Sequence, residues 1–559
     1  MSAANGAKSP PAVTLKTPDQ ESLRRQVASL VVVRASGHAF DRQRRYPRWE
    51  LANAELKRLL EAGVGGVILL GGSCVELRQR CHQLQAWAGR PLLLCADVEE
   101  GVGQRFEGGQ WLVPPMALGR LFQTEPQRAE TLAEAYGVCT GREARLCGLN
   151  WVLAPIVDVN NNPANPVINV RAWGEDPTTV ERLTVAFQRG LAQEGVLGCA
   201  KHFPGHGDTA VDSHLQLPVL PHRLERLEQL ELKPFRASIA AGIASVMTAH
   251  LQIPALDPKR PATLSKAVLT ELLRKQLGFE GLVVTDALVM EAIRAHYSPG
   301  DAALLAFEAG ADLILMPEDA DEAIEAICTG VQSGRLPLER LEASVRRREQ
   351  AVAGLPSSTE GPDHEPLNLE LASDEVLGTT LLELTGEHNG QHLSALDGQE
   401  GINLIRVDGV LPCPQLTATA AALRLPEQVG FRTLLQHPQA LPVWRDSHSA
   451  APLDLERLGE GPVLLQLFLR GNPFRAGRDL QEPWTASLAQ LQAAGRLAGL
   501  AVYGSPYAWE ELRQTLDPSI PAAYSPGQMP AAQQWVLERM LGTATADSSE
   551  SGPGNGFTD

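Results

Sequence analysis

The sequence predicts an α/β protein with an N-terminal (β/α)8 barrel of the TIM type, followed by a smaller α/β layered sandwich domain. The chain has 559 residues, which is more than a single ordinary domain requires. Before residue 354, short apolar runs alternate with amphipathic stretches of helical length. A segment rich in Gly, Ser and Pro follows, and the alternation then resumes. These observations together predict two α/β domains joined by a linker.

Eight apolar runs are the expected strands of the barrel. They are short, aliphatic or β-branched, and do not alternate with polar residues, which is typical of strands buried on both faces. The runs cover residues 29–36, 65–70, 91–97, 149–155, 197–203, 245–250, 281–288 and 311–317. Helical patterns lie between them, for example at 50–63, 126–146 and 270–278. Eight strand–helix units favour a closed barrel over the alternative, an open doubly wound sheet.

Composition predicts the domain boundaries. We expect disordered tails at 1–18 and 545–559, the barrel at 19–353, a linker at 354–366 and the second domain at 367–544. In the second domain, strands are expected at 402–409, 462–471 and 499–506, and helices at 484–495 and 530–542. This domain contains neither a GxGxxG nor a Walker motif, and nothing in its sequence indicates a chemical function.

Charge and cysteine content narrow the class of protein. The net charge of −17 argues against nucleic acid or an anionic membrane as a partner and favours a neutral substrate. The eight cysteines are scattered without a CxxC pair, which predicts buried reduced thiols rather than disulfides or zinc ligands. The N-terminus lacks an apolar signal core and no run reaches transmembrane length, so we predict a soluble, cytoplasmic protein. The oligomeric state is not determined by the sequence.

Polar side chains at the ends of the expected strands are candidate site residues. Asp97 ends the third run, Lys201 and His202 end the fifth, His250 ends the sixth, and Asp286 lies near the end of the seventh. Active sites of such barrels lie at the C-terminal ends of the strands. A charge beside a buried strand is costly unless it is paired or solvated. We therefore expect these groups to share one site.

The loop 201–218, KHFPGHGDTAVDSHLQLP, contains three histidines and two aspartates. In extended backbone, Asp212 and His214 project to the same side, so the carboxylate can accept a hydrogen bond from one imidazole nitrogen. This contact fixes the tautomer and raises the basicity of the other nitrogen, which produces an oriented general acid/base. A hydrogen bond that only stabilises the loop is the alternative.

A zinc site is a further alternative for this loop. Its ligands would be His202, His206, Asp208 and His214. The proline and glycine between the first two histidines make a helix improbable, so no element fixes the ligand geometry. We expect neither a metal nor a cofactor.

Asp286 is the candidate nucleophile. It follows the apolar run in GLVVTDALVM (281–290), where packing does not explain a carboxylate. At the C-terminal end of a barrel strand it could attack an anomeric carbon and form a covalent glycosyl intermediate, with His214 as the acid/base. The alternative role for Asp286 is the N-cap of the next helix.

These motifs resemble glycoside hydrolase family 3, in particular its bacterial β-N-acetylglucosaminidase branch. The loop 201–218 is similar to the signature loop of that branch with its Asp–His dyad, and 281–290 is similar to the segment that carries the nucleophile. NPVINVRAWGEDP (165–177) and DVEEGVGQRF (97–106) resemble sugar-binding segments. The resemblance implies that Asp286 is the nucleophile and that the sugar is bound by Asp97, Arg105, Arg171, Lys201 and His202. We expect Lys201 and Arg171 to pair with carboxylates such as Asp97.

The sequence departs from the family pattern at a few positions. Glu100 stands where the family has its first glycine after D-x-E, and Gly103 replaces a valine. Asn169 replaces the usual glycine two residues before Arg171. We therefore expect the backbone near the sugar to differ from that of the family.

The resemblance implies a retaining exo-glycosidase that removes terminal β-linked N-acetylglucosamine. Asp286 would form the covalent intermediate, with Asp212 and His214 as the acid/base dyad. The expected partner is a carbohydrate, such as a fragment of chitin or of the bacterial cell wall during peptidoglycan turnover. Alternatives are a β-glucosidase or a glycoside phosphorylase of the same family, or a sugar-binding protein on a catalytically decayed barrel.

Overall fold

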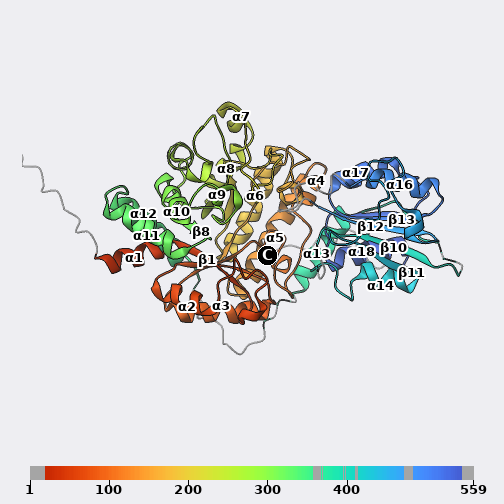
Figure 1. The fold of residues 1–559 in the computed structure, drawn as a ribbon, viewed down its shortest axis with the longest axis horizontal. Coiled ribbons are helices and arrows are strands. Elements are labelled where there is room, and N and C mark those ends of the chain that lie inside the picture. The colour runs from red at the N-terminus through yellow and green to blue at the C-terminus, as the bar shows by residue number, and fades with distance from the viewer. Residues whose placement is uncertain are drawn as a thin grey trace, which may run out of the picture.

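The structure is a computed structural model that shows two α/β bodies side by side (Figure 1). It describes residues 19–356, 367, 369, 371–394, 396, 398–409, 413–470 and 482–543. The predicted tails at 1–18 and 545–559, and the linker from 357 to 366, lie outside the described residues. The predicted domain boundaries stay predictions, whereas the predicted fold class is confirmed.

The first body is a barrel of parallel strands. One ladder has the order β4-β3-β2-β1-β8 and a second has the order β5-β6-β7. Single parallel bridges at Trp151–Leu197 and Ile156–Lys201 join β4 to β5, and a bridge at Val284–Leu313 joins β7 to β8. Each predicted run contains one strand: β1 (Val31–Ser36), β2 (Gly66–Leu70), β3 (Leu93–Ala96), β4 (Trp151–Val152), β5 (Cys199–Phe203), β6 (Ser245–Thr248), β7 (Leu282–Val284) and β8 (Ile314–Leu315). The closed barrel is therefore confirmed over the open sheet.

Helices surround this barrel and begin at recognisable capping residues. Ser73 and Glu76 form a capping box at α3, and Asp176 caps α6, whose first residue is a proline. The helices are α1 (Gln20–Ala28), α2 (Asn53–Ala62), α3 (Cys74–Ala88), α4 (Met116–Phe122), α5 (Pro126–Leu146), α6 (Pro177–Gln193), α7 (Leu224–Gln229), α8 (Leu232–Ala240), α9 (Glu291–Arg294), α10 (Pro299–Ala309), α11 (Ala320–Gln332) and α12 (Leu338–Ala353). The helix predicted at 270–278 is instead a π-helical segment, Ala267–Gln276. Among the described helices, none combines the length and the apolar character that a membrane crossing needs.

The second body is a three-layer sandwich around a six-stranded sheet. The strand order is β11 (Phe431–Gln436), β10 (Gly401–Arg406), β12 (Val463–Leu469), β13 (Leu497–Gly504), β14 (Ala522–Ser525) and β9 (Glu387–His388), and only β9 is antiparallel. Helices α14 (Ala421–Gln428) and α18 (Pro530–Leu541) pack on one face, and α16 (Trp484–Ala493) and α17 (Pro506–Thr515) pack on the other (Figure 1). The predicted strands are the central ones. Three further strands are not among the predicted ones: β11, whose residues are mostly part-exposed, and the short strands β14 and β9.

The two bodies meet at the end of the barrel where the loops after the strands lie. Arg470, directly after β12, forms an ion pair with Glu100, which follows β3. Tyr507 at the start of α17 accepts a hydrogen bond from Asn160 Nδ2 at 2.9 Å. Helix α13 (Ala372–Thr385) lies between the bodies and packs on α4 and α5 (Figure 1). The second body therefore covers part of the loop end of the barrel.

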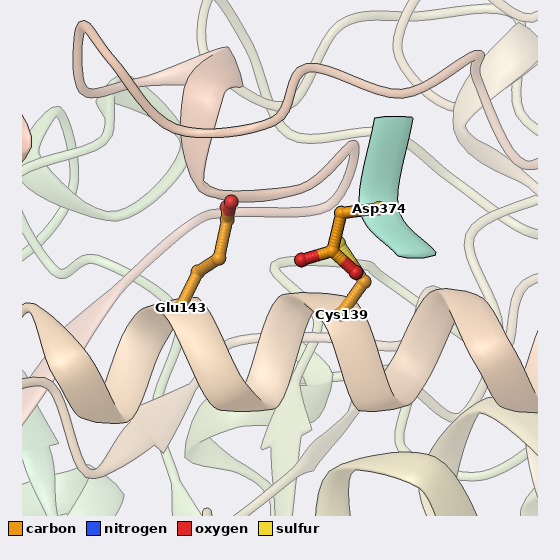
Figure 2. Close-up of side chains that lie close together, drawn as sticks. All are labelled: Cys139, Glu143 and Asp374. Atoms are coloured by element: carbon orange, nitrogen blue, oxygen red, sulfur yellow. The ribbon is translucent and has the colours of Figure 1, made fainter. Parts of the chain in front are cut away.

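A buried acidic cluster lies where α13 packs on α5 (Figure 2). Cys139 and Glu143 project from the same side of α5 toward Asp374 of α13, and their donor atoms lie within 4.8 Å of one another. Arg142 forms an ion pair with Asp374, and Gln110 N donates to Glu143 at 3.0 Å. Burial raises the pKa of Glu143 to about 7, although the Gln110 amide opposes this effect.

The raised pKa of Glu143 predicts a pH-dependent stability. The folded state holds this proton more tightly than the unfolded chain, so the stabilisation is full below the ordinary pKa of 4.5 and is lost as the pH rises through about 7. Glu143→Gln cannot ionise. Its free energy of unfolding relative to wild type should therefore rise by about 2 kcal/mol between pH 5 and pH 8.5. Urea unfolding at both pH values measures this difference, and parallel pH dependences of the two proteins would contradict it.

All eight cysteines are free and buried, as predicted. Burial raises the pKa of Cys81 to about 12 and that of Cys328 to about 11. Thiols in such surroundings stay protonated and unreactive at neutral pH.

Candidate active site

The predicted site residues gather at the loop end of the barrel. Asp97 follows β3, Lys201 and His202 belong to β5, and Asp286 follows β7. Arg171 ends a short 3-10 helix, Asn169–Arg171, in the segment between β4 and α6. The remaining predicted residues are Arg105, in the loop after β3, and Asp212 and His214, in the loop after β5. Arg105 is exposed, and its Nε donates to the carbonyl of Asp97 at 3.0 Å.

A buried carboxylate that the sequence analysis missed, Glu99, holds the two candidate sugar-binding cations. Lys201 Nζ lies 2.7 Å from Glu99 Oε1 and 2.7 Å from Asp97 Oδ1. Arg171 donates from Nε and Nη2 to the two oxygens of Glu99 at 2.8 Å each. The expected pairing of Lys201 with Asp97 is present, whereas the carboxylate that accepts hydrogen bonds from Arg171 is Glu99. We call Glu99 with Lys201 and Arg171 the Glu99 clamp.

The charges of the Glu99 clamp compensate one another. Burial alone raises the pKa of Glu99, but Arg171 and Lys201 outweigh it and hold this pKa well below its usual range. Burial lowers the pKa of Lys201, but Asp97 and Glu99 outweigh it and raise the pKa to about 12. The cations therefore stay charged beside Asp97, whose side chain is 38% exposed and open to a ligand.

A second missed carboxylate, Asp158, orients His202. Its Oδ2 lies 2.8 Å from His202 Nδ1, and its Oδ1 accepts from the backbone amide of His206 at 2.7 Å. Burial raises the pKa of Asp158, but His202 outweighs it and the pKa is lowered. An ionised carboxylate at Nδ1 places the proton there and leaves Nε2 of His202 for a ligand hydroxyl. The signal in the sequence was a charge directly after an apolar segment, APIVD (154–158).

The four residues of the alternative zinc site do not gather into one cluster among the described residues. All four proposed ligands are among the described residues, yet no three of their donor atoms gather within 4.8 Å of one another. His206 Nδ1 lies 2.8 Å from Thr209 Oγ1 and its Nε2 lies 3.0 Å from Ser213 Oγ. Burial lowers the pKa of His206 to about 4, so this imidazole is neutral and serves the packing of the loop.

Asp212 and His214 lie in contact on the loop after β5. Asp212 Oδ1 accepts from the His214 backbone amide at 2.8 Å and lies 2.9 Å from His214 Nδ1. The Asp212 side chain is 1% exposed and that of His214 is 20% exposed. The loop turns at Gly205, whose φ of +131° and closeness to Glu231 exclude a side chain. A buried carboxylate therefore orients a partly exposed imidazole, which is the geometry that proton transfer requires.

Asp286 lies on the turn after β7 and does not cap a helix. The next helix, α9, has Met290 at its N-cap, so the alternative capping role is wrong. Asp286 Oδ1 accepts from the amide of Ala287 at 2.7 Å. Burial raises the pKa of Asp286, but electrostatic interactions with His250, His202 and His214 and the Ala287 amide outweigh it and lower the pKa. Asp286 is therefore ionised at neutral pH.

The backbone at Asn169 and at Gly103 restricts which residues fit there. Asn169 has a φ of +42°, in the left-handed region that glycine favours and asparagine tolerates. Its Nδ2 donates to the carbonyls of Pro163 and Asn165 at 3.2 Å each. A Cβ at Gly103 would lie 2.1 Å from the carbonyl oxygen of Gly109, so this loop requires a glycine there. Asn169 therefore occupies a position that a glycine would also fit.

Comparison with known families covers both bodies. Residues 22–350 match the sequence model of the Glycosyl hydrolase family 3 N terminal domain, and residues 394–542 match that of the Bacterial Glycosyl hydrolase family 3 C-terminal domain. The two matched ranges together contain most of the described residues.

Individual relatives and a solved structure show the same likeness. The chain is 35% identical over 390 residues to beta-hexosaminidase A of Pseudoalteromonas piscicida, a match that covers 64% of this chain and 62% of that relative, less than two thirds of its length. It is 37% identical over 282 residues to a beta-hexosaminidase of Thiobacillus denitrificans, with 49% and 78% covered. A solved family 3 beta-N-acetylglucosaminidase from a Paenibacillus species superposes with a TM-score of 0.73 at 29% identity, over 94% of this chain and 97% of that one.

Proposed function

Because the chain belongs to glycoside hydrolase family 3, we propose that it is a retaining β-N-acetylhexosaminidase that removes terminal β-linked N-acetylglucosamine. The observation that carries this proposal is that the Asp212–His214 dyad and the carboxylate of Asp286 lie at the same end of the barrel, in the loops after β5 and β7. The names of the relatives support the choice of sugar. Fragments of chitin or of the bacterial cell wall would supply such termini.

The first half of the proposed reaction forms a covalent intermediate. The Glu99 clamp, Asp97, Arg105 and His202 bind the hydroxyls of the terminal sugar. A carboxylate oxygen of Asp286 attacks the anomeric carbon while the bond to the leaving oxygen breaks. Protonated His214 gives its Nε2 proton to that oxygen, so the aglycone leaves as a neutral alcohol.

The second half releases the sugar. Neutral His214 takes a proton from water, and the water oxygen attacks the anomeric carbon and breaks the ester bond to Asp286. The anomeric carbon is inverted in each half of the reaction, so its configuration is retained overall. The carboxylate of Asp286 and the protonated imidazole of His214 are restored at the end of the cycle. The negative charges of Asp286 and Asp212 stabilise the positive charge that develops on the sugar and on the imidazole.

A panel of aryl glycosides tests this function against its alternatives. We expect the p-nitrophenyl β-N-acetylglucosaminide to be hydrolysed about 10²-fold faster than the p-nitrophenyl β-glucoside at equal concentration. Free N-acetylglucosamine should be the product whether or not phosphate is present. A sugar 1-phosphate formed in phosphate buffer would instead show a phosphorylase. Calorimetric binding of N-acetylglucosamine without turnover of either glycoside would show a sugar-binding protein.

A further inference from the structure

Glu100 has a role that the family resemblance does not supply, because the family motif has a glycine at this position. Its side chain is 1% exposed and it directly follows Glu99 in the chain. Arg470 donates to its carboxylate from Nη2 at 2.5 Å and from Nη1 at 3.2 Å. Trp111 donates from Nε1 to the same carboxylate at 2.9 Å. A buried charge is thus neutralised by a residue from elsewhere in the chain.

Arg470 comes from the second body, 370 positions along the chain from Glu100. It directly follows β12, and its side chain is 11% exposed. The ion pair therefore forms only when the sheet of the second body is docked on the loop end of the barrel. Its two-pronged geometry fixes the direction of the carboxylate as well as its charge.

The backbone of Glu99 and Glu100 forms one rigid turn. Gln104 Oε1 accepts from the amides of both residues, at 2.9 Å from Glu99 and 3.1 Å from Glu100. The Leu112 amide donates to the Glu100 carbonyl at 2.8 Å. A displacement of the Glu100 side chain is therefore passed to Glu99, one residue away, and so to Lys201 and Arg171.

We propose that Arg470 and Glu100 are positioning residues that couple docking of the second body to the geometry of the Glu99 clamp. Without Arg470, the buried carboxylate of Glu100 must move toward another positive group or toward water. Either movement would shift the turn that also carries Glu99, and a shift of Glu99 would disturb Lys201 and Arg171, which it holds. This inference rests on the proposed function of the clamp in binding the terminal sugar.

Arg470→Met tests the coupling, because methionine keeps the apolar stem and removes the charge. We expect KM for the p-nitrophenyl β-N-acetylglucosaminide to rise and kcat/KM to fall by about 10- to 100-fold, the scale seen when the support of a binding group is lost. kcat should change less, because Asp286 and His214 are untouched. Arg470→Lys should recover part of kcat/KM, since it restores the charge without the two-pronged geometry.

The double variant Glu100→Gln with Arg470→Met separates charge from packing. It leaves no buried charge unpaired, so its kcat/KM should exceed that of Arg470→Met alone. Arg142→Met is the matched control, because Arg142 also pairs with a buried carboxylate between the two bodies, Asp374 of α13. It should lower the thermal midpoint as Arg470→Met does and leave KM and kcat as in wild type.

The outcomes distinguish this inference from the proposed function. An active wild type with unchanged KM in Arg470→Met overturns the coupling and leaves the function standing. An equal rise of KM in Arg470→Met and Arg142→Met also overturns it, because general destabilisation would then explain both. A wild type that neither hydrolyses the glycoside nor binds N-acetylglucosamine rejects the proposed function and this inference with it.

Discussion

Alanine in place of Asp286 is expected to reduce hydrolysis of the p-nitrophenyl β-N-acetylglucosaminide by roughly 10⁴-fold or more, the scale seen when a covalent nucleophile is removed. Without this carboxylate no glycosyl intermediate forms, and the positive charge on the sugar loses its anionic partner. The variant should fold, because the side-chain hydrogen bond found for Asp286 is to its own neighbour, the Ala287 amide. Initial rates and a thermal unfolding curve measure both properties.

Adding azide to Asp286→Ala tests whether the missing carboxylate is the nucleophile, because azide can take its place. In Asp286→Ala, azide can enter the vacated space and attack the anomeric carbon while the aryl oxide leaves. The expected product is the α-glycosyl azide, with inverted configuration, from the β-glycoside. Asp301→Ala, a change at an exposed aspartate of α10, is the control and should keep wild-type rates. Full activity of Asp286→Ala would reject the role assigned to this residue.

Alanine in place of His214 is expected to lower kcat/KM for the same substrate by about 10²–10⁴-fold. The loss should depend on the leaving group. Dinitrophenolate leaves without help from an acid, so the first half of the reaction should be nearly normal with the 2,4-dinitrophenyl glycoside. The covalent intermediate should then accumulate, because water attack still lacks its base, and a burst of dinitrophenol should precede a slow steady state.

Variants at Asp212 and at the exposed His296 are compared with His214→Ala in kcat/KM. Asp212→Asn keeps the shape of the dyad and removes the negative charge that stabilises the imidazolium, so a smaller loss of about 10- to 100-fold is expected. His296→Ala changes an exposed histidine after α9 and should have no effect. If His214→Ala loses the same factor in kcat/KM with the p-nitrophenyl and the 2,4-dinitrophenyl glycoside, and shows no burst, His214 is not the proton donor.

The second body contacts the loops at the C-terminal ends of the barrel strands. In the sequence it appears as a separate α/β domain without chemistry of its own. In the structure, Arg470 and Tyr507 reach the loops after β3 and β4. Glu100, which stands where the family motif has a glycine, supplies the carboxylate for Arg470. The loops that carry the candidate site residues Asp97 and Glu99 therefore also contact the second body.

Local features of the fold were predictable because they depend on residues close together in the chain. A buried parallel strand requires a short apolar run, and each of the eight predicted runs contains one. The contact between Asp212 and His214 follows from two residues on one side of an extended segment. The helix at 126–146 begins at a proline and matches α5, Pro126–Leu146. The second sheet was less predictable, because edge strands such as β11 are only part-buried and carry a weak pattern.

The sequence by itself determined the barrel, the second α/β layer and the loop that carries Asp212 and His214. Only the tertiary structure decided which charges meet: Glu99 with Arg171, Asp158 with His202, and Glu100 with Arg470. The physical reason is that an ion pair depends on distance and burial in space, which no local periodicity encodes. A carboxylate forms a buried ion pair only when folding brings a distant cation to it and excludes water from both groups.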